Sequence, residues 1–186
     1  MIINVRGTSG TGKSTVMRQV MKGASSKTRV MRDGRRQPFG YLLQYPGKKN
    51  LVAVIGHYET PCGGCDTIQS YEEIYDAVRK ADDAGYDVLY EGLLISGEHA
   101  RPTALHNEGR DIRVIGLSTP LDVCIDSINQ RRWAKNPDKP PVKERNTIAK
   151  ARAVEIAMQK MTEAGLKAVW RDRSNAIRQI KEWLNV

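Results

Sequence analysis

The amino-acid sequence predicts a single α/β domain, a three-layer sandwich with a mainly parallel five-stranded sheet between two layers of helices. Short apolar runs rich in β-branched residues alternate with segments whose apolar residues recur at helical spacing. The 186 residues are enough for one hydrophobic core and match the usual size of one domain. We therefore treat residues 1–186 as one domain. Its sheet is expected to contain residues 2–5, 28–31, 86–90, 111–117 and 166–170.

A glycine-rich loop follows the first of these runs. Residues 7–14 fit the pattern G-x-x-x-x-G-K-[ST], and Val16 and Val20 begin a helical repeat directly after it. In such a phosphate-binding loop (P-loop), backbone N–H groups and the positive end of the next helix converge on a polyphosphate. Lys13 adds a cation for the β- and γ-phosphates, and Ser14 offers a hydroxyl to Mg²⁺. The predicted nucleoside triphosphate site comprises Thr8, Ser9, Gly10, Thr11, Gly12, Lys13, Ser14 and Thr15.

The segment after the second predicted strand interrupts the βαβ pattern. Residues 39–45 and 51–58 are apolar runs that flank the sequence Pro-Gly-Lys-Lys-Asn, which predicts a β-hairpin with a five-residue loop. We interpret this hairpin as an insertion, and an insertion at this point is a natural place for a substrate site.

Residues 56–67 read Gly-His-Tyr-Glu-Thr-Pro-Cys-Gly-Gly-Cys-Asp-Thr and form a second unusual stretch. Cys62 and Cys65 match the first half of a zinc site, but no second pair of this kind follows. The interpretation that we favour is a tight Gly-Gly loop that positions an acid or hydroxyl near a substrate. The side chains that such a loop offers are Glu59, Thr60 and Asp66.

An acidic residue ends the next strand. Ser70 and Glu73 form a capping box for a helix, after which residues 86–90 are expected to form a buried strand. Glu91 at its tip is placed like the acid of a Walker B strand, which holds Mg²⁺ directly or through water. Ser14 and Glu91 are therefore the predicted metal contacts.

The last third of the chain is mainly helical. Thr119 is expected to cap a helix that ends before the proline-rich residues 136–141, which cannot continue it. A long helix is predicted over residues 143–164. After the last strand, Ser174 is expected to cap the final helix.

Charge is distributed unevenly along the chain, whose formal net charge is +9. Residues 18–49 hold nine Lys and Arg against one Asp, whereas residues 50–109 are strongly acidic. Residues 129–152 are basic again, and we interpret them as a lid in which Arg131 neutralises charge on a transferred phosphoryl group. The two basic segments predict either a polyanionic partner such as nucleic acid, or phosphate clamping with solvated helix faces.

Three classes of protein share the P-loop: switch GTPases, large ATPases and small kinases. The Asn-Lys-x-Asp segment of GTPases is absent, and large ATPase modules need a longer chain than this one. A small kinase with a basic lid fits best, and it requires a base near the acceptor hydroxyl.

Asp33 is the first candidate for that base. Arg32-Asp33-Gly34-Arg35-Arg36 resembles the Arg-Asp-x-x-Arg arrangement of polynucleotide kinases. The resemblance implies that Asp33 deprotonates a hydroxyl while Arg36 holds a neighbouring phosphate. Asp66 and Glu59 stay open as alternative bases. The predicted catalytic set is Lys13, Asp33, Arg36, Glu91 and Arg131.

The chain as a whole resembles the 5-hydroxymethyluracil DNA kinases of bacteriophages, enzymes of thymidine hypermodification. The resemblance rests on residues 4–15, 56–67 and 88–94, and the second of these segments is much the most particular. It implies transfer of the γ-phosphoryl group of ATP, with Mg²⁺, to the hydroxymethyl group of a base already in DNA.

Two alternatives stay open: a kinase of free deoxynucleosides or nucleotides, and a non-catalytic, nucleotide-dependent DNA-binding module. The N-terminus has no apolar run long enough for a signal peptide or membrane span. We therefore expect a cytoplasmic protein, in the host cytoplasm if it is phage-encoded. The sequence does not fix the oligomeric state.

Overall fold

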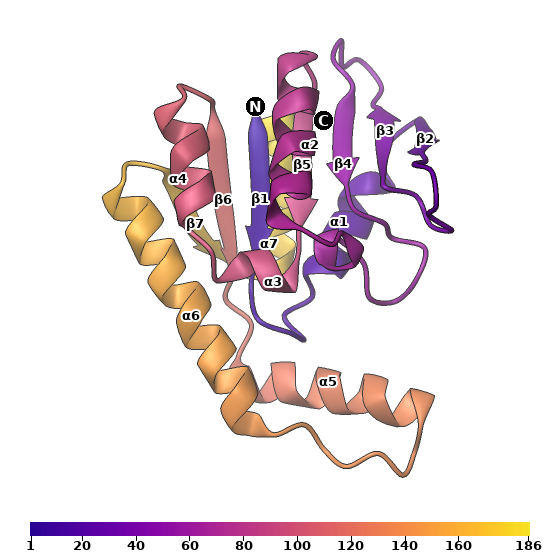
Figure 1. Ribbon diagram of the computed structural model, residues 1–186, viewed down its shortest axis with the longest axis vertical. Coiled ribbons are helices and arrows are strands. Elements are labelled where there is room, and N and C mark those ends of the chain that lie inside the picture. The colour runs from indigo at the N-terminus through magenta and orange to yellow at the C-terminus, as the bar shows by residue number, and fades with distance from the viewer.

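The computed structural model describes residues 1–186 and has one seven-stranded sheet with the order β2-β3-β4-β5-β1-β6-β7 (Figure 1). The α/β sandwich is confirmed. Five strands are parallel, as predicted, but two more extend the sheet at one edge. The strands are β1 (Ile2–Arg6), β2 (Ser26–Val30), β3 (Gly40–Gln44), β4 (Val52–Ile55), β5 (Asp87–Glu91), β6 (Ile112–Leu117) and β7 (Lys167–Arg171).

The prediction for the second parallel strand was wrong. Residues 26–30 form β2, an exposed edge strand that pairs antiparallel with β3, whereas β4 lies beside β5 in the parallel sheet. All four residues of β4 are buried, as expected for a continuous apolar run in a parallel strand. The predicted β3–β4 hairpin exists, but the inserted strands are β2 and β3 rather than β3 and β4.

Helices cover both faces of the sheet. The helices are α1 (Lys13–Met21), α2 (Tyr71–Asp83), α3 (Leu93–Ser96), α4 (Ala100–Asn107), α5 (Leu121–Lys135), α6 (Glu144–Glu163) and α7 (Arg173–Leu184). One core forms between the sheet and α2, α4 and α6, and a second forms between the sheet and α1 and α7. No helix is both long and apolar enough to cross a membrane.

Helix boundaries follow local capping, with two corrections. The Ser70 hydroxyl accepts from Glu73 N at 3.0 Å, which confirms the capping box of α2. Asp172, not Ser174, caps α7 by accepting from Asn175 N. Thr119 does not cap α5 either, because its hydroxyl donates to the carbonyl of Thr11 in the P-loop. The short helices α3 and α4 were not predicted.

The segment predicted as a lid extends beyond the carboxyl edge of the sheet (Figure 1). It comprises the end of α5, a connector over residues 136–143 and the start of α6. The connector folds back on α5, since Arg132 donates to the carbonyl of Pro140 and the Trp133 indole donates to that of Lys139. Val142 N also donates to Asn129 Oδ1 at 2.8 Å. These contacts tie the basic connector to the helix that borders the P-loop.

Candidate active site

The P-loop joins β1 to α1 at the carboxyl edge of the sheet. Gly10 and Gly12 have φ values of 86° and 92°, a left-handed conformation that favours glycine. A Cβ at Gly10 would also lie 2.2 Å from the carbonyl oxygen of Cys124 in α5. The loop therefore packs closely against α5. It also borders a cavity of about 370 Å³, which we call the transfer cavity.

Lys13 occupies the inner side of this loop. Its ammonium donates to the carbonyl oxygens of Gly7 at 2.8 Å and Thr8 at 3.1 Å. Burial lowers the pKa of Lys13, although the carboxylates of Glu91 and Asp66 act in the opposite direction. The loop thus places a desolvated cation beside the transfer cavity.

Ser14 and Glu91 meet across the same cavity. The Ser14 hydroxyl donates to Glu91 Oε1 at 2.8 Å. Burial raises the pKa of Glu91 to about 7, opposed by Lys13 and by the hydrogen bond from Ser14. The predicted pairing of these two side chains follows from the parallel sheet, because β1 and β5 are neighbours and both end at this edge.

The pair suits Mg²⁺, which prefers oxygen ligands and usually keeps only one or two protein carboxylates beside water and phosphate. No group of three or more His, Cys, Asp or Glu side chains is arranged to hold a metal. Cys65 is buried and Cys62 is exposed, and neither belongs to such a group.

Asp66 is the acid that the 56–70 loop delivers to the transfer cavity. Its Oδ1 accepts from the backbone N–H groups of Leu93 and Leu94 at the start of α3, at 2.7 and 3.3 Å. These bonds fix the carboxylate and leave Oδ2 for other partners. The Asp66 charge acts on both Lys13 and Glu91.

Gly64 permits this placement. It has a φ of 82°, and a Cβ there would lie 2.5 Å from the Glu91 carbonyl oxygen and 2.6 Å from Glu91 Oε1. The Gly-Gly pair therefore lets the loop pack directly on the end of β5, so that Asp66 follows at the mouth of the cavity.

The other candidate acids lie elsewhere. Asp33 and Arg36 are exposed in the loop between β2 and β3, and neither lines the transfer cavity. Glu59 accepts from the Tyr41 hydroxyl at 2.8 Å and pairs with Arg29 at 3.2 Å, outside the cavity. The roles predicted for Asp33 and Arg36 stay predictions, and the structure brings Asp66 rather than either of them to the P-loop.

Two arginines complete the cavity wall. Arg131 on α5 lines it as predicted, and its guanidinium donates to Ser127 O at 3.1 Å and Cys62 Sγ at 3.5 Å. Arg173 at the start of α7 lines it as well and lies so close to Gly12 that a Cβ there would be 2.6 Å from Arg173 Cδ. The sequence analysis did not identify Arg173. Its position shortly after the last strand was the only feature that could have indicated a role.

A second, cation-rich cavity of about 580 Å³ adjoins the first. It lies between α5 with its connector on one side and Pro61 and Cys62 on the other. The two cavities share four lining residues: Ser9, Pro61, Cys62 and Arg131. Beyond them, the cations that line the second cavity are Arg132, Lys135 and Lys139.

Known proteins resemble this chain in sequence and in fold. A family model described as 5-hmdU DNA kinase matches residues 1–156. The 5-hmdU DNA kinase of Pseudomonas phage PaMx11 is 49% identical over 183 residues, which cover 98% of this chain and 96% of that protein. The 5-hmdU DNA kinase of Delftia phage PhiW-14 is 26% identical over 200 residues, covering 99% and 72% of the two chains. A solved deoxyadenosine kinase from M. mycoides, with dCMP and dCDP bound, aligns over 100% of this chain and 99% of its own. Its identity of 14% and TM-score of 0.50 show a shared fold alone.

Proposed function

Because the chain belongs to the 5-hmdU DNA kinase family, we propose that it transfers the γ-phosphoryl group of ATP to the hydroxymethyl oxygen of 5-hydroxymethyluracil in DNA. One observation carries the proposal: Lys13, Ser14, Glu91 and Asp66 all line the transfer cavity. This cavity offers a phosphate cradle, an oxygen pair for Mg²⁺ and a fixed carboxylate to a single reacting centre.

The P-loop binds the triphosphate through its backbone N–H groups and Lys13. Ser14 and Glu91 would hold Mg²⁺, which when bound neutralises charge on the β- and γ-phosphate oxygens. Arg131 and Arg173 face the same space from α5 and α7. They stabilise the charge that develops on the equatorial oxygens during transfer.

We assign the base to Asp66. Its Oδ1 is occupied by the two amides of α3, so Oδ2 is the oxygen that accepts the proton of the acceptor hydroxyl. The acceptor oxygen then forms the new P–O bond, the bond between the γ-phosphorus and the β–γ bridging oxygen breaks, and ADP leaves. Asp33 serves as the comparison residue, because it is exposed and lies outside the cavity.

DNA as the acceptor is supported by the cation-rich cavity under α5. Its cations continue from Arg131 of the transfer cavity to Lys139 of the connector. A mononucleotide that presents one phosphate has no use for such a row, whereas successive phosphates of a strand do. The strand is proposed to follow α5 while the modified base enters the transfer cavity past Cys62.

The test is phosphate transfer from labelled ATP, with Mg²⁺, to matched DNAs that contain thymine or 5-hydroxymethyluracil, with the free hydroxymethyl-deoxyuridine monophosphate in parallel. Label confined to the hydroxymethyluracil DNA is expected. Label confined to the free nucleotide would overturn DNA as the acceptor.

The DNA path has its own test. Lys135→Gln combined with Lys139→Gln should lower the slope of log affinity against log salt by about 0.7–0.9 per contact removed. Lys160→Gln, an exposed cation of α6 that lines neither cavity, is the matched control. An unchanged slope in the double variant would remove the connector from the DNA path.

A further inference from the structure

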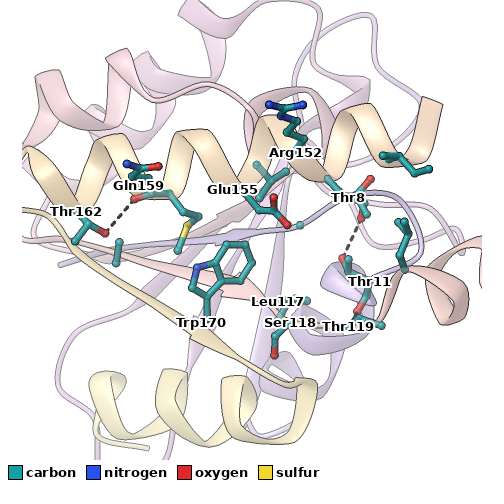
Figure 2. A pocket seen from close by; sticks show the side chains of 17 residues that line it. Thr8, Thr11, Leu117, Ser118, Thr119, Arg152, Glu155, Gln159, Thr162 and Trp170 are labelled. Atoms are coloured by element: carbon teal, nitrogen blue, oxygen red, sulfur yellow. Dashed lines mark hydrogen bonds between the residues drawn. The ribbon is translucent and has the colours of Figure 1, made fainter. Parts of the chain in front are cut away.

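The P-loop borders a third cavity on its opposite side. This cavity measures about 750 Å³ and lies between α6 and the strands β6 and β7 (Figure 2). Gly7, Thr8 and Thr11 face it, whereas Ser9, Gly10 and the residues from Gly12 to Thr15 face the transfer cavity. The two cavities share no lining residue, and the size of the third falls in the usual range of small-molecule sites. We call it the rear cavity.

An indole ring forms the strand side of the rear cavity. Trp170 lies on the edge strand β7, and 42% of its surface is exposed. Its ring covers Gly116 of β6 at the place where a side chain would project, because a Cβ there would lie 2.6 Å from Trp170 Cε3 and 2.7 Å from Cζ3. Because Gly116 has no side chain, one face of the Trp170 ring packs against the sheet, and the other face is directed toward α6.

Helix α6 forms the opposite side with two kinds of residue. Ala151, Val154 and Met158 recur at helical spacing and make an apolar lining. Glu155 stands among them at the rim, and Figure 2 shows its carboxylate on the side of the cavity that faces the Trp170 ring. Arg152 lies one turn before Glu155 at the same rim.

We propose that the rear cavity binds a nucleobase that carries an exocyclic amino group. A flat aromatic ligand stacks on Trp170, and such stacking tolerates any base. A purely hydrocarbon ligand would strip water from the Glu155 carboxylate without replacing its hydrogen bonds. A ligand with an amino group would donate hydrogen bonds to the carboxylate in place of this water, as cytosine N4 does to acidic side chains. Arg152, which also lines the cavity, adds a positive charge for the phosphate that accompanies the base in a nucleotide or a strand.

The donor nucleotide does not supply this base. In the proposed reaction its phosphates bind on the other side of the loop, where Lys13 and Ser14 line the transfer cavity. Ser127 and Gln130 of α5 also line the transfer cavity, and neither lines the rear cavity. The rear ligand is therefore a second one.

Thr8 connects the two sites. Its carbonyl accepts from Lys13 Nζ at 3.1 Å and from the Thr11 hydroxyl at 3.0 Å, while its own hydroxyl contacts the carbonyl of Thr147 in α6 at 3.5 Å. A ligand bound between α6 and the P-loop would therefore affect the Thr8 carbonyl, which accepts the hydrogen bond from Lys13. Rear-cavity binding should consequently change ATP affinity, and ATP should change the rear affinity by the same factor.

The test measures binding of four probes: dCMP, dTMP, and short single strands of deoxycytidylate and thymidylate. Tryptophan quenching and calorimetry are followed for the parent protein, Trp170→Ala and Glu155→Ala. For the mononucleotide probes the control is Trp133→Phe, a tryptophan with the same exposed fraction of 42% that lies outside the rear cavity. Glu155 is exposed on a helix, where alanine is well tolerated.

The parent protein and the control should prefer cytosine over thymine by about tenfold, as expected for one charged hydrogen bond. Trp170→Ala should lose binding of both bases, and Glu155→Ala should lose only the preference. Lys13→Ala should keep the Trp170-dependent binding, because this binding depends neither on the transfer cavity nor on the proposed kinase reaction.

Tighter Trp170-dependent binding of the strand than of dCMP would identify the ligand as a base of DNA, and equal Trp170-dependent binding per base would identify a free nucleotide. Either result supports the site. Unchanged affinities in Trp170→Ala, or equal affinities for cytosine and thymine in the parent protein, would overturn it.

Discussion

Glu91→Gln should stabilise the protein at alkaline pH while it abolishes phosphoryl transfer. Glu91 is buried at the end of β5, and burial raises its pKa to about 7 from an ordinary value of 4.5. A carboxyl group whose pKa is higher in the folded than in the unfolded state binds its proton more tightly when folded. Its contribution to stability is complete below about pH 4.5 and is lost as the pH rises to about 7.

The shift is worth about 3 kcal/mol, at about 1.4 kcal/mol for each pKa unit. Glutamine cannot ionise, and its side-chain oxygen still accepts from Ser14. The variant loses the attraction between Glu91 and Lys13, which offsets part of the gain. We therefore expect Glu91→Gln to exceed the parent in free energy of unfolding by about 1–3 kcal/mol near pH 8, with no gain near pH 4.5.

The assay is urea unfolding followed by circular dichroism across this pH range, in EDTA so that metal binding does not contribute. The difference between variant and parent should grow between about pH 4.5 and pH 7 and then level off. A pH-independent difference, or a variant that is less stable near pH 8, would refute the account of Glu91 as a carboxylate destabilised by burial. Phosphate transfer by the variant should be lost at every pH, since one of the two oxygens for Mg²⁺ is gone.

Other substitutions separate the remaining roles. Asp66→Asn should lower kcat by about 10²–10⁴-fold with little change in ATP affinity, whereas Asp33→Asn should retain near-parent turnover; a severe loss in Asp33→Asn alone would return the base to Asp33. Lys13→Ala should abolish transfer and weaken ATP binding, measured by calorimetry, and full ATP affinity would contradict its phosphate contact. Tyr41→Phe leaves the N–H of Tyr58 without its acceptor, so thermal unfolding should show a loss of about 1–3 kcal/mol; an unchanged stability would argue against that contact.

The sequence was sufficient for features that depend on neighbouring residues. The P-loop pattern, the capping box at Ser70 and the acidic end of β5 are each set within a few residues, and the structure confirms all three elements. The meeting of Ser14 with Glu91 also followed, because parallel strands present their carboxyl ends at one edge. These predictions needed only local pattern and a rule of topology.

Features that depend on pairing across the sheet could not be predicted. An apolar run of four residues such as β4 looks the same in a hairpin and in a parallel sheet, and only its position beside β5 distinguishes them. For the same reason the position of Asp33 could not be predicted: it follows the antiparallel edge strand β2, not a strand of the parallel part of the sheet. In the sequence, Asp66 was only an alternative to Asp33, together with Glu59. The amides of α3, a helix too short to predict, single it out.

The two inserted strands explain why Glu59 is not the base although it lies in the same loop as Asp66. The Tyr41 hydroxyl on β3 accepts from Tyr58 N at 3.0 Å and donates to Glu59 Oε1 at 2.8 Å, while Arg29 on β2 pairs with the other carboxylate oxygen. The hydrogen bond from Tyr41 is the main reason that the pKa of Glu59 is lowered. A carboxylate held in its charged form by these partners is a poor proton acceptor, but it anchors the loop to the extended sheet. The inserted strands β2 and β3 thus hold the start of the loop in place, while Asp66 near its end lines the transfer cavity.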